Sequence, residues 1–179
     1  DEYGGSMAKR SRFAIELIKA VRAAVGPEFP IILRFSQWKQ QDYSARLVQT
    51  SEQLGEFMQP LSDAGVDIFH CSTRRFWEAE FEGSELNLAG WTRKLTGKPT
   101  ITVGSVGLDG EFLEFMVSTD KVAKPTDLGA LLTRLNNKEF DLVAVGRALL
   151  VDPDWAIKVR DGNQQDILPF SRGALMTLV

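Results

Sequence analysis

Four short apolar segments, each followed by a stretch with helical spacing, constrain the fold of this chain more than any other feature. The segments are Ile31–Phe35, Val66–Cys71, Lys98–Val103 and Leu142–Val145. They begin a few tens of residues apart, which is typical of repeated βα units. Such units pair their strands in parallel through right-handed crossovers. The pattern therefore predicts an α/β chain built on a four-stranded parallel sheet.

The helices that the sequence predicts have recognisable ends. Ser6 is a plausible N-cap for a helix over Ser6–Val25, and Gly26 is placed to end it. Thr50 and Gln53 fit a capping box, and Pro60 should kink or shorten the helix that follows. Apolar residues of the first helix share one face: Ala14, Leu17, Ile18, Val21, Ala24 and Val25. Helices are also expected over Ser51–Ala64, Leu88–Leu95, Leu128–Leu135 and Asp154–Arg160, and Glu111–Val117 has no clear assignment.

Composition limits the functional classes. The chain has 179 residues, of which 44% are hydrophobic and 25% charged, with a net charge of −3. We expect one domain over residues 1–179, without nucleic-acid binding, a membrane span or a secretory signal, and thus a cytoplasmic protein. A single cysteine, Cys71, excludes an internal disulfide. A single histidine, His70, argues against a zinc site or a histidine-based triad, and no metal is expected.

Two strand ends carry glycines that indicate a phosphate-binding corner. Gly146 and Arg147 follow the last apolar segment, and Gly104 and Ser105 follow the one before it. Glycine lets a backbone N–H approach a ligand, and arginine offers a planar charged fork that suits a phosphate. An arginine after a strand is, in the alternative interpretation, a surface residue. Asp152 and Pro153, a few residues on, predict the N-cap and first turn of the last helix.

Several short motifs, taken together, resemble the Old Yellow Enzyme family of FMN-dependent NAD(P)H oxidoreductases, which reduce activated alkenes. The segment Asp1-Glu-Tyr-Gly-Gly-Ser6, followed by Arg10, Arg12 and Phe13, resembles one family motif. The ordered match continues through Leu33–Ser36, His70–Ser72, Gly104–Ser105 and Val145–Arg147. The resemblance implies the C-terminal half, about strands five to eight, of a TIM (β/α)8 barrel. A small open doubly wound sheet is the alternative architecture.

The resemblance also implies individual roles. Arg34 matches the arginine beside the pyrimidine side of FMN, where a fixed guanidinium stabilises the negative charge of the reduced ring. Gly104, Ser105, Gly146 and Arg147 match the positions that hold the FMN phosphate. The alternative to a flavin contact for Arg34 is a structural ion pair with Asp67. His70 and Cys71 are interpreted as packing residues.

The rest of the active site is expected elsewhere. By the resemblance, the proton-donating tyrosine and the residues that bind the carbonyl of the substrate precede Asp1, so no catalytic residue is expected in this segment. An aromatic pair beside the flavin is replaced around Gly173–Ala174. The chain alone is therefore expected to be inactive until the missing N-terminal half completes the barrel, and homo-oligomers are possible. Candidates for lining the pocket of an unsaturated carbonyl substrate, or for packing their loop, are Arg75, Phe76 and Trp77.

Two other functions are compatible with the residues alone. A phosphate-binding barrel could be a lyase or isomerase, although a candidate base is lacking, because Lys98 stands at the start of its strand and not at the carboxyl end. A non-enzymatic α/β domain could bind a nucleotide or a partner through its open strand edges.

Overall fold

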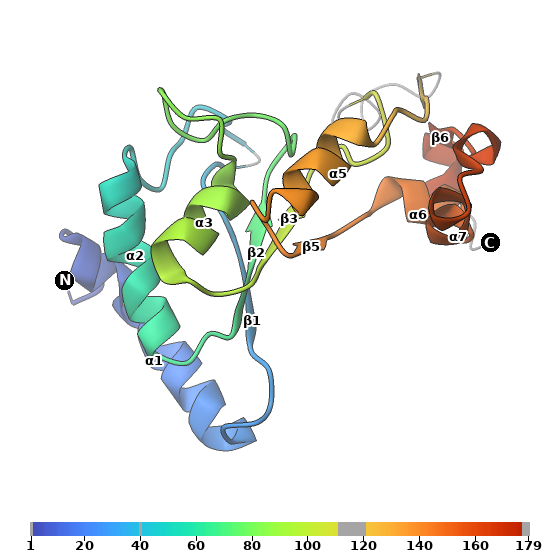
Figure 1. Ribbon diagram of the computed structural model, residues 1–179. Helices are drawn as coiled ribbons and strands as arrows, with labels where there is room; N and C mark the ends of the chain where they lie inside the picture. The colour runs from blue at the N-terminus through green and yellow to red at the C-terminus, as the bar shows by residue number, and fades with distance from the viewer. Residues whose placement is uncertain (1, 40, 111–120, 177–179) are drawn as a thin grey trace.

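The computed structural model describes residues 2–39, 41–110 and 121–176. Its centre is a four-stranded sheet with the order β1-β2-β3-β5, in which every neighbouring pair is parallel (Figure 1). The strands are β1 (Ile32–Ser36), β2 (Ile68–Ser72), β3 (Thr100–Val103) and β5 (Leu142–Val143). The predicted parallel sheet is confirmed, although β5 is shorter than the apolar run that predicted it.

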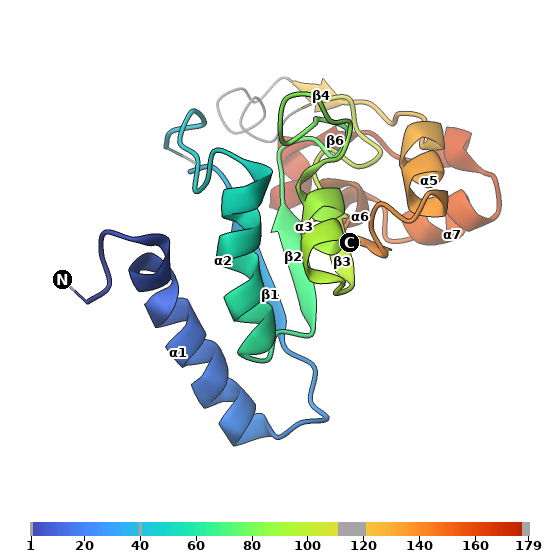
Figure 2. The ribbon, with the colours of Figure 1, turned by 60° about the vertical axis from the view of Figure 1, so that its left-hand side comes forward.

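Helices cover one face of this sheet. In Figures 1 and 2, α1 (Met7–Val25), α2 (Ser51–Asp63) and α3 (Leu88–Thr96) lie on the same side. Helix α3 contacts β2 and β3, α2 packs on α3, and α1 packs on α2. Side chains cap all three helices as expected from their residue types: Ser6 accepts the N–H of Lys9, Thr50 that of Gln53, and Asn87 that of Gly90.

The two faces of the sheet differ in burial. Phe69 and Cys71 of β2 point to the helices and are fully buried. The opposite face, which we call the bare face, carries Ile32, Arg34, His70, Ile101 and Leu142, aligned across the strands by the parallel register. At its two edges Ile32 and Leu142 are 52% and 50% exposed. Buried parallel sheets are normally covered on both faces, whereas the described residues cover only one face of this sheet.

The apolar face predicted for the first helix is mostly uncovered. Ile18 is buried, whereas Leu17 is 54% exposed and Val21 and Val25 are also exposed. The reason is that, among the described elements, α1 packs mainly against α2. Together with the bare face, the outer side of α1 forms a second apolar surface without a covering layer.

Pro60 lies inside α2 and does not shorten it, because the helix continues to Asp63. One local prediction is wrong. Asp152 is not the N-cap of the last helix, which starts at Trp155. Its buried carboxylate instead accepts hydrogen bonds from Lys158 Nζ (2.7 Å) and the backbone N–H of Leu168 (3.0 Å). Asp152 therefore ties the end of α6 (Arg147–Val151) to α7 (Trp155–Arg160) and the following loop.

The C-terminal part adds a small antiparallel ribbon that the sequence did not predict. Strands β4 (Val122–Ala123) and β6 (Phe170–Ser171) pair with each other, and β6 contacts α6 (Figure 2). The remaining elements are α5 (Gly129–Asn136) and two short 3₁₀ turns, η1 (Gln164–Asp166) and η2 (Arg172–Leu175). The unassigned segment Glu111–Val117 lies outside the described residues. Among the helices that the structure describes, none is long and apolar enough to cross a membrane.

Candidate functional site

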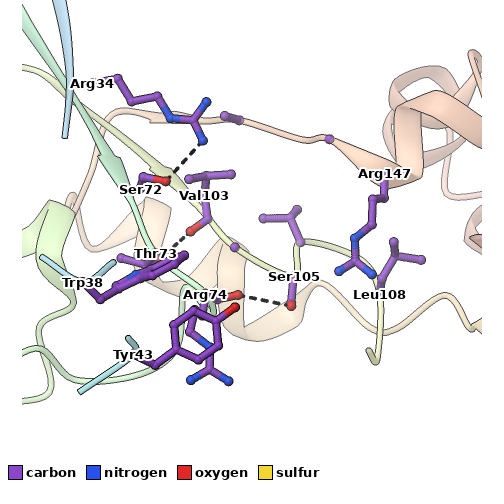
Figure 3. Close-up of a pocket in the computed structure, with 14 residues that line it drawn as sticks. Arg34, Trp38, Tyr43, Ser72, Thr73, Arg74, Val103, Ser105, Leu108 and Arg147 are labelled. Carbon is purple, nitrogen blue, oxygen red and sulfur yellow. Dashed lines mark hydrogen bonds between the residues drawn. The ribbon is translucent and has the colours of Figure 1, made fainter. Parts of the chain in front are cut away.

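A cavity of about 380 Å³ opens at the carboxyl ends of the parallel strands, and we call it the strand-end cavity. This is the edge at which parallel α/β sheets and barrels place their ligand sites. All five residues predicted to bind the cofactor line it: Arg34, Gly104, Ser105, Gly146 and Arg147. Figure 3 shows Arg34 and Arg147 entering from opposite sides, with Ser105 between them. The tertiary structure thus brings together residues that are more than a hundred positions apart in sequence.

Arg34 lies at the end of β1 on the bare face, and its Nη2 donates to Ser72 Oγ of β2 at 3.2 Å. The alternative partner, Asp67, is engaged elsewhere. Its carboxylate accepts the N–H of Ile31 at 2.7 Å and a hydrogen bond from Arg22, and these contacts lower its pKa. Arg34 is therefore not held in the alternative ion pair, and its guanidinium faces the cavity.

The close approach of two loops requires a glycine at position 104. Its φ of 128° is in the region that favours glycine, and a Cβ built there would lie 2.6 Å from the carbonyl oxygen of Thr73. Two hydrogen bonds join the same loops: Phe76 N–H donates to the Gly104 carbonyl (3.1 Å), and Ser105 Oγ donates to the Arg74 carbonyl (3.2 Å). The loop after β3 is thereby locked to the loop after β2.

Gly146 is glycine for a different reason. Its φ is −106° and its ψ −94°, and no atom lies within 4 Å of a Cβ built on it. The neighbouring Arg147 is half-buried, donates from Nη2 to the Gly110 carbonyl at 2.5 Å, and has its guanidinium carbon 5.5 Å from the centre of the Phe170 ring. Open space therefore borders the backbone of Gly146, beside a positioned guanidinium.

The three candidates for the substrate pocket take different places. Arg75 lines a smaller recess beside the strand-end cavity. Phe76 is buried in its own loop, where its carbonyl accepts a hydrogen bond from Asn87 Nδ2 at 2.7 Å. Trp77 is 43% exposed and contacts Phe76 edge to face. The residues described as lining the strand-end cavity include neither Phe76 nor Trp77.

Other lining residues were not singled out from the sequence. Arg74 follows β2 by two residues, and a search of the positions just after each strand would have found it. Trp38 and Tyr43 lie in the long loop after β1, which has no periodicity to mark them. Their rings meet edge to face, with centroids 4.9 Å apart (Figure 3).

His70 and Cys71 lie next to each other on opposite faces of β2. Burial, with a smaller contribution from the charge of Arg34, lowers the pKa of His70, and its buried Nε2 has no hydrogen-bond partner within the described chain. Burial raises the pKa of the Cys71 thiol to about 12. A thiol with so high a pKa is a poor nucleophile, so Cys71 is a packing residue.

The parallel strands and the cavity at their carboxyl ends are typical of a segment of a barrel enzyme, and comparison with known proteins identifies its family. The profile of the NADH:flavin oxidoreductase / NADH oxidase family matches residues 1–166. An NADH oxidase of Thermoanaerobacter brockii is 31% identical over 175 residues, covering 93% of this chain and 23% of that protein. An NADPH dehydrogenase of Bacillus velezensis is 30% identical over 159 residues, covering 87% of this chain and 40% of that protein.

Solved structures agree on the fold. Morphinone reductase in complex with tetrahydroNAD superposes with a TM-score of 0.62 at 22% identity, covering 90% of this chain and 37% of that one. A 2-naphthoyl-CoA reductase superposes with a TM-score of 0.64 at 20% identity, covering 95% of this chain and 24% of that one. These likenesses confirm the expected half of a TIM (β/α)8 barrel over the open doubly wound sheet.

The chain belongs to the NADH:flavin oxidoreductase / NADH oxidase family, as the Old Yellow Enzyme resemblance implied. FMN and NAD(P)H are the cofactors of this family. The chain spans between about a quarter and two fifths of the length of the curated relatives described above.

Proposed function

We propose that this chain is the FMN-holding segment of an NAD(P)H-dependent ene-reductase, which acts on activated alkenes once an N-terminal half completes the barrel. The observation that supports this most directly is that Arg34, Gly104, Ser105, Gly146 and Arg147 line one cavity. The volume of the cavity, about 380 Å³, lies in the range of small-molecule sites. Membership of a flavin oxidoreductase family favours this function over a lyase or a non-enzymatic domain.

The residues of the cavity fit a flavin nucleotide at both of its ends. The open space beside Gly146 leaves room for a phosphate close to the backbone, and Arg147 offers charged hydrogen bonds worth about 1.5–3 kcal/mol each. Arg34 fits the pyrimidine end, where a permanently charged guanidinium stabilises negative charge without taking up a proton. FMN, when bound, supplies hydride transfer from NAD(P)H to the β-carbon of an unsaturated carbonyl compound.

The proposal also explains the uncovered surfaces. The bare face and the outer side of α1 are the surfaces that further βα units would cover in a closed barrel. The group that donates the proton to the substrate, and the groups that bind its carbonyl, would then come from the N-terminal half. We propose that residues 1–179 bind the cofactor only weakly, and reduce no alkene, without that half.

Flavin absorbance tests the proposal. The chain is mixed with FMN with and without the N-terminal half of a family member, and bound flavin is measured after gel filtration. Arg147→Ala should weaken FMN binding about tenfold or more through the lost charged hydrogen bonds, and should change NAD(P)H binding less. The exposed Arg160, whose partner is the adjacent Asp161, provides the control Arg160→Ala. Equal losses of FMN and NAD(P)H binding in Arg147→Ala would contradict the phosphate assignment.

A further inference from the structure

Two aspartates at the amino-terminal edge of the sheet make the same pair of contacts, and we call each arrangement a strand clamp. Asp67 precedes β2: its carboxylate accepts the N–H of Ile31 at 2.7 Å, and its own N–H donates to the Ile31 carbonyl at 3.0 Å. Asp141 precedes β5: its carboxylate accepts the N–H of Thr100 at 2.9 Å, and its own N–H donates to the Thr100 carbonyl at 3.0 Å. Each clamp therefore fixes the starts of two neighbouring strands with two hydrogen bonds.

An arginine from the helix before each strand pair holds the carboxylate of its clamp. Arg22, in the last turn of α1, donates to the carboxylate of Asp67. Arg93, in the last turn of α3, donates from Nε to Oδ2 of Asp141 at 3.1 Å and from Nη1 to the Lys138 carbonyl at 2.9 Å. Charge-assisted hydrogen bonds are stronger than neutral ones and restrict the direction of both groups. The arginines therefore keep each carboxylate turned toward the strand N–H that it accepts.

The two clamps differ in how much other pairing supports them. Strands β1 and β2 pair at five positions. Strands β3 and β5, which lie side by side in Figure 1, pair at two positions within the described residues. Beyond these positions, the N–H of Ala144 donates to the Thr102 carbonyl at 2.8 Å. The register of β5 therefore depends on the clamp at Asp141 more than the register of β2 depends on the clamp at Asp67.

The register of β5 against β3 decides where the phosphate-binding corner lies. Gly104 follows β3 and Gly146 follows β5, so this corner stands at the opposite end of the two strands from the clamp. A slip of one residue would move Gly146 along β3 by about 3.3 Å and would turn the side chains of β5 to the other face. Hydrogen bonds to a phosphate tolerate much smaller displacements than that.

We propose that Asp141, held by Arg93, is a positioning residue that sets the register of β5 and so places Gly146 for the phosphate of FMN. This inference rests on the proposed function, which assigns the phosphate to that corner. Asp67 has the same chemistry on the strand pair that carries Arg34, at the pyrimidine end of the site. The two clamps therefore act on different ends of the cofactor, and Asp67 is the matched control for Asp141.

The test compares the dissociation constants of FMN and of riboflavin, which is the same flavin without the phosphate. Both are titrated by flavin fluorescence into the barrel formed by residues 1–179 and the N-terminal half of a family member. Asp141→Ala should lower the preference for FMN over riboflavin about tenfold or more, because small misplacements in a well-oriented site have effects of that size. Asp141→Asn keeps an oxygen that can accept the Thr100 N–H, and it should restore most of the preference. Asp67→Ala should leave the preference unchanged, even where both affinities fall together.

A loss of stability alone would not produce this pattern, because it would weaken the binding of both flavins equally. Thermal unfolding shows whether each variant is folded. If Asp141→Ala does not fold, Arg93→Gln leaves the carboxylate in place and should lower the preference in the same direction. An unchanged preference in these variants, or an equal loss in Asp67→Ala, would overturn the positioning role. Failure of the proposed function is seen separately, because the unaltered protein would then show no preference for FMN, and the positioning role would fall with it.

Discussion

At the scale of single residues, the environment of His70 makes folding stability depend on pH. His70 lies on the bare face beside Arg34, and its pKa is lowered in the folded protein by burial and by that neighbouring charge. The unfolded chain takes up the proton near the ordinary histidine pKa of about 6.5. Below that pH the unfolded state therefore binds more protons than the folded state, and folding stability falls as the pH falls.

His70→Gln should remove this pH dependence. The free energy of unfolding, measured by urea denaturation from neutral pH down to about pH 5.5, should fall less steeply in the variant than in the unaltered chain. The variant removes all histidine titration, because the sequence contains one histidine. Identical slopes in the two proteins would mean that the proton affinity of His70 does not change on folding.

At the scale of elements, the lock between the loops after β2 and β3 decides the shape of the cavity. Gly104 permits the close approach, and the hydrogen bonds of Phe76 and Ser105 hold it. Gly146, on the other side of the cavity, has space around it. The same substitution at these two glycines should therefore have different consequences.

Gly104→Ala should lower the free energy of unfolding by about 2 kcal/mol or more, because it combines a positive φ with overlap against backbone atoms. Gly146→Ala should lower stability less than Gly104→Ala, because a Cβ at Gly146 meets no atom within 4 Å, and should weaken FMN binding, because the added methyl occupies the space assigned to the phosphate. Thermal unfolding and flavin titration measure the two effects. If the Gly146→Ala variant bound FMN normally, the phosphate could not lie against the backbone of Gly146.

At the scale of the whole molecule, the uncovered surfaces should govern association. Within the part of the chain that the structure describes, β1 and β5 are the edge strands of the sheet. The bare face and the outer side of α1 expose apolar side chains such as Ile32, Leu142 and Leu17. Surfaces of this kind associate in water. Residues 1–179 on their own are therefore expected to form dimers or aggregates.

Sedimentation velocity measures this association directly. Adding the N-terminal half of a family member should convert the larger species into a one-to-one complex, since the same surfaces would then be covered. A sharp monomeric boundary for residues 1–179 alone, at micromolar concentration, would show that the uncovered surfaces do not drive association.

The sequence by itself determined the order of the elements and one part of the site. Apolar runs, caps and glycine stops are local signals, and they predicted the four parallel strands and the helices between them. Arg34, Gly104, Ser105, Gly146 and Arg147 could be predicted because short motifs next to strand ends mark them, and parallel strands bring their carboxyl ends to one edge.

Only the tertiary structure decided the rest. Arg74, Tyr43 and Trp38 meet because the loop after β1 folds over the loop after β2, and no periodicity in either loop records that contact. Packing also decided that Phe76 turns into its own loop, and that α1 leaves Leu17 uncovered. Such outcomes depend on which surfaces become neighbours in space, and in a barrel those neighbours lie far apart in the sequence.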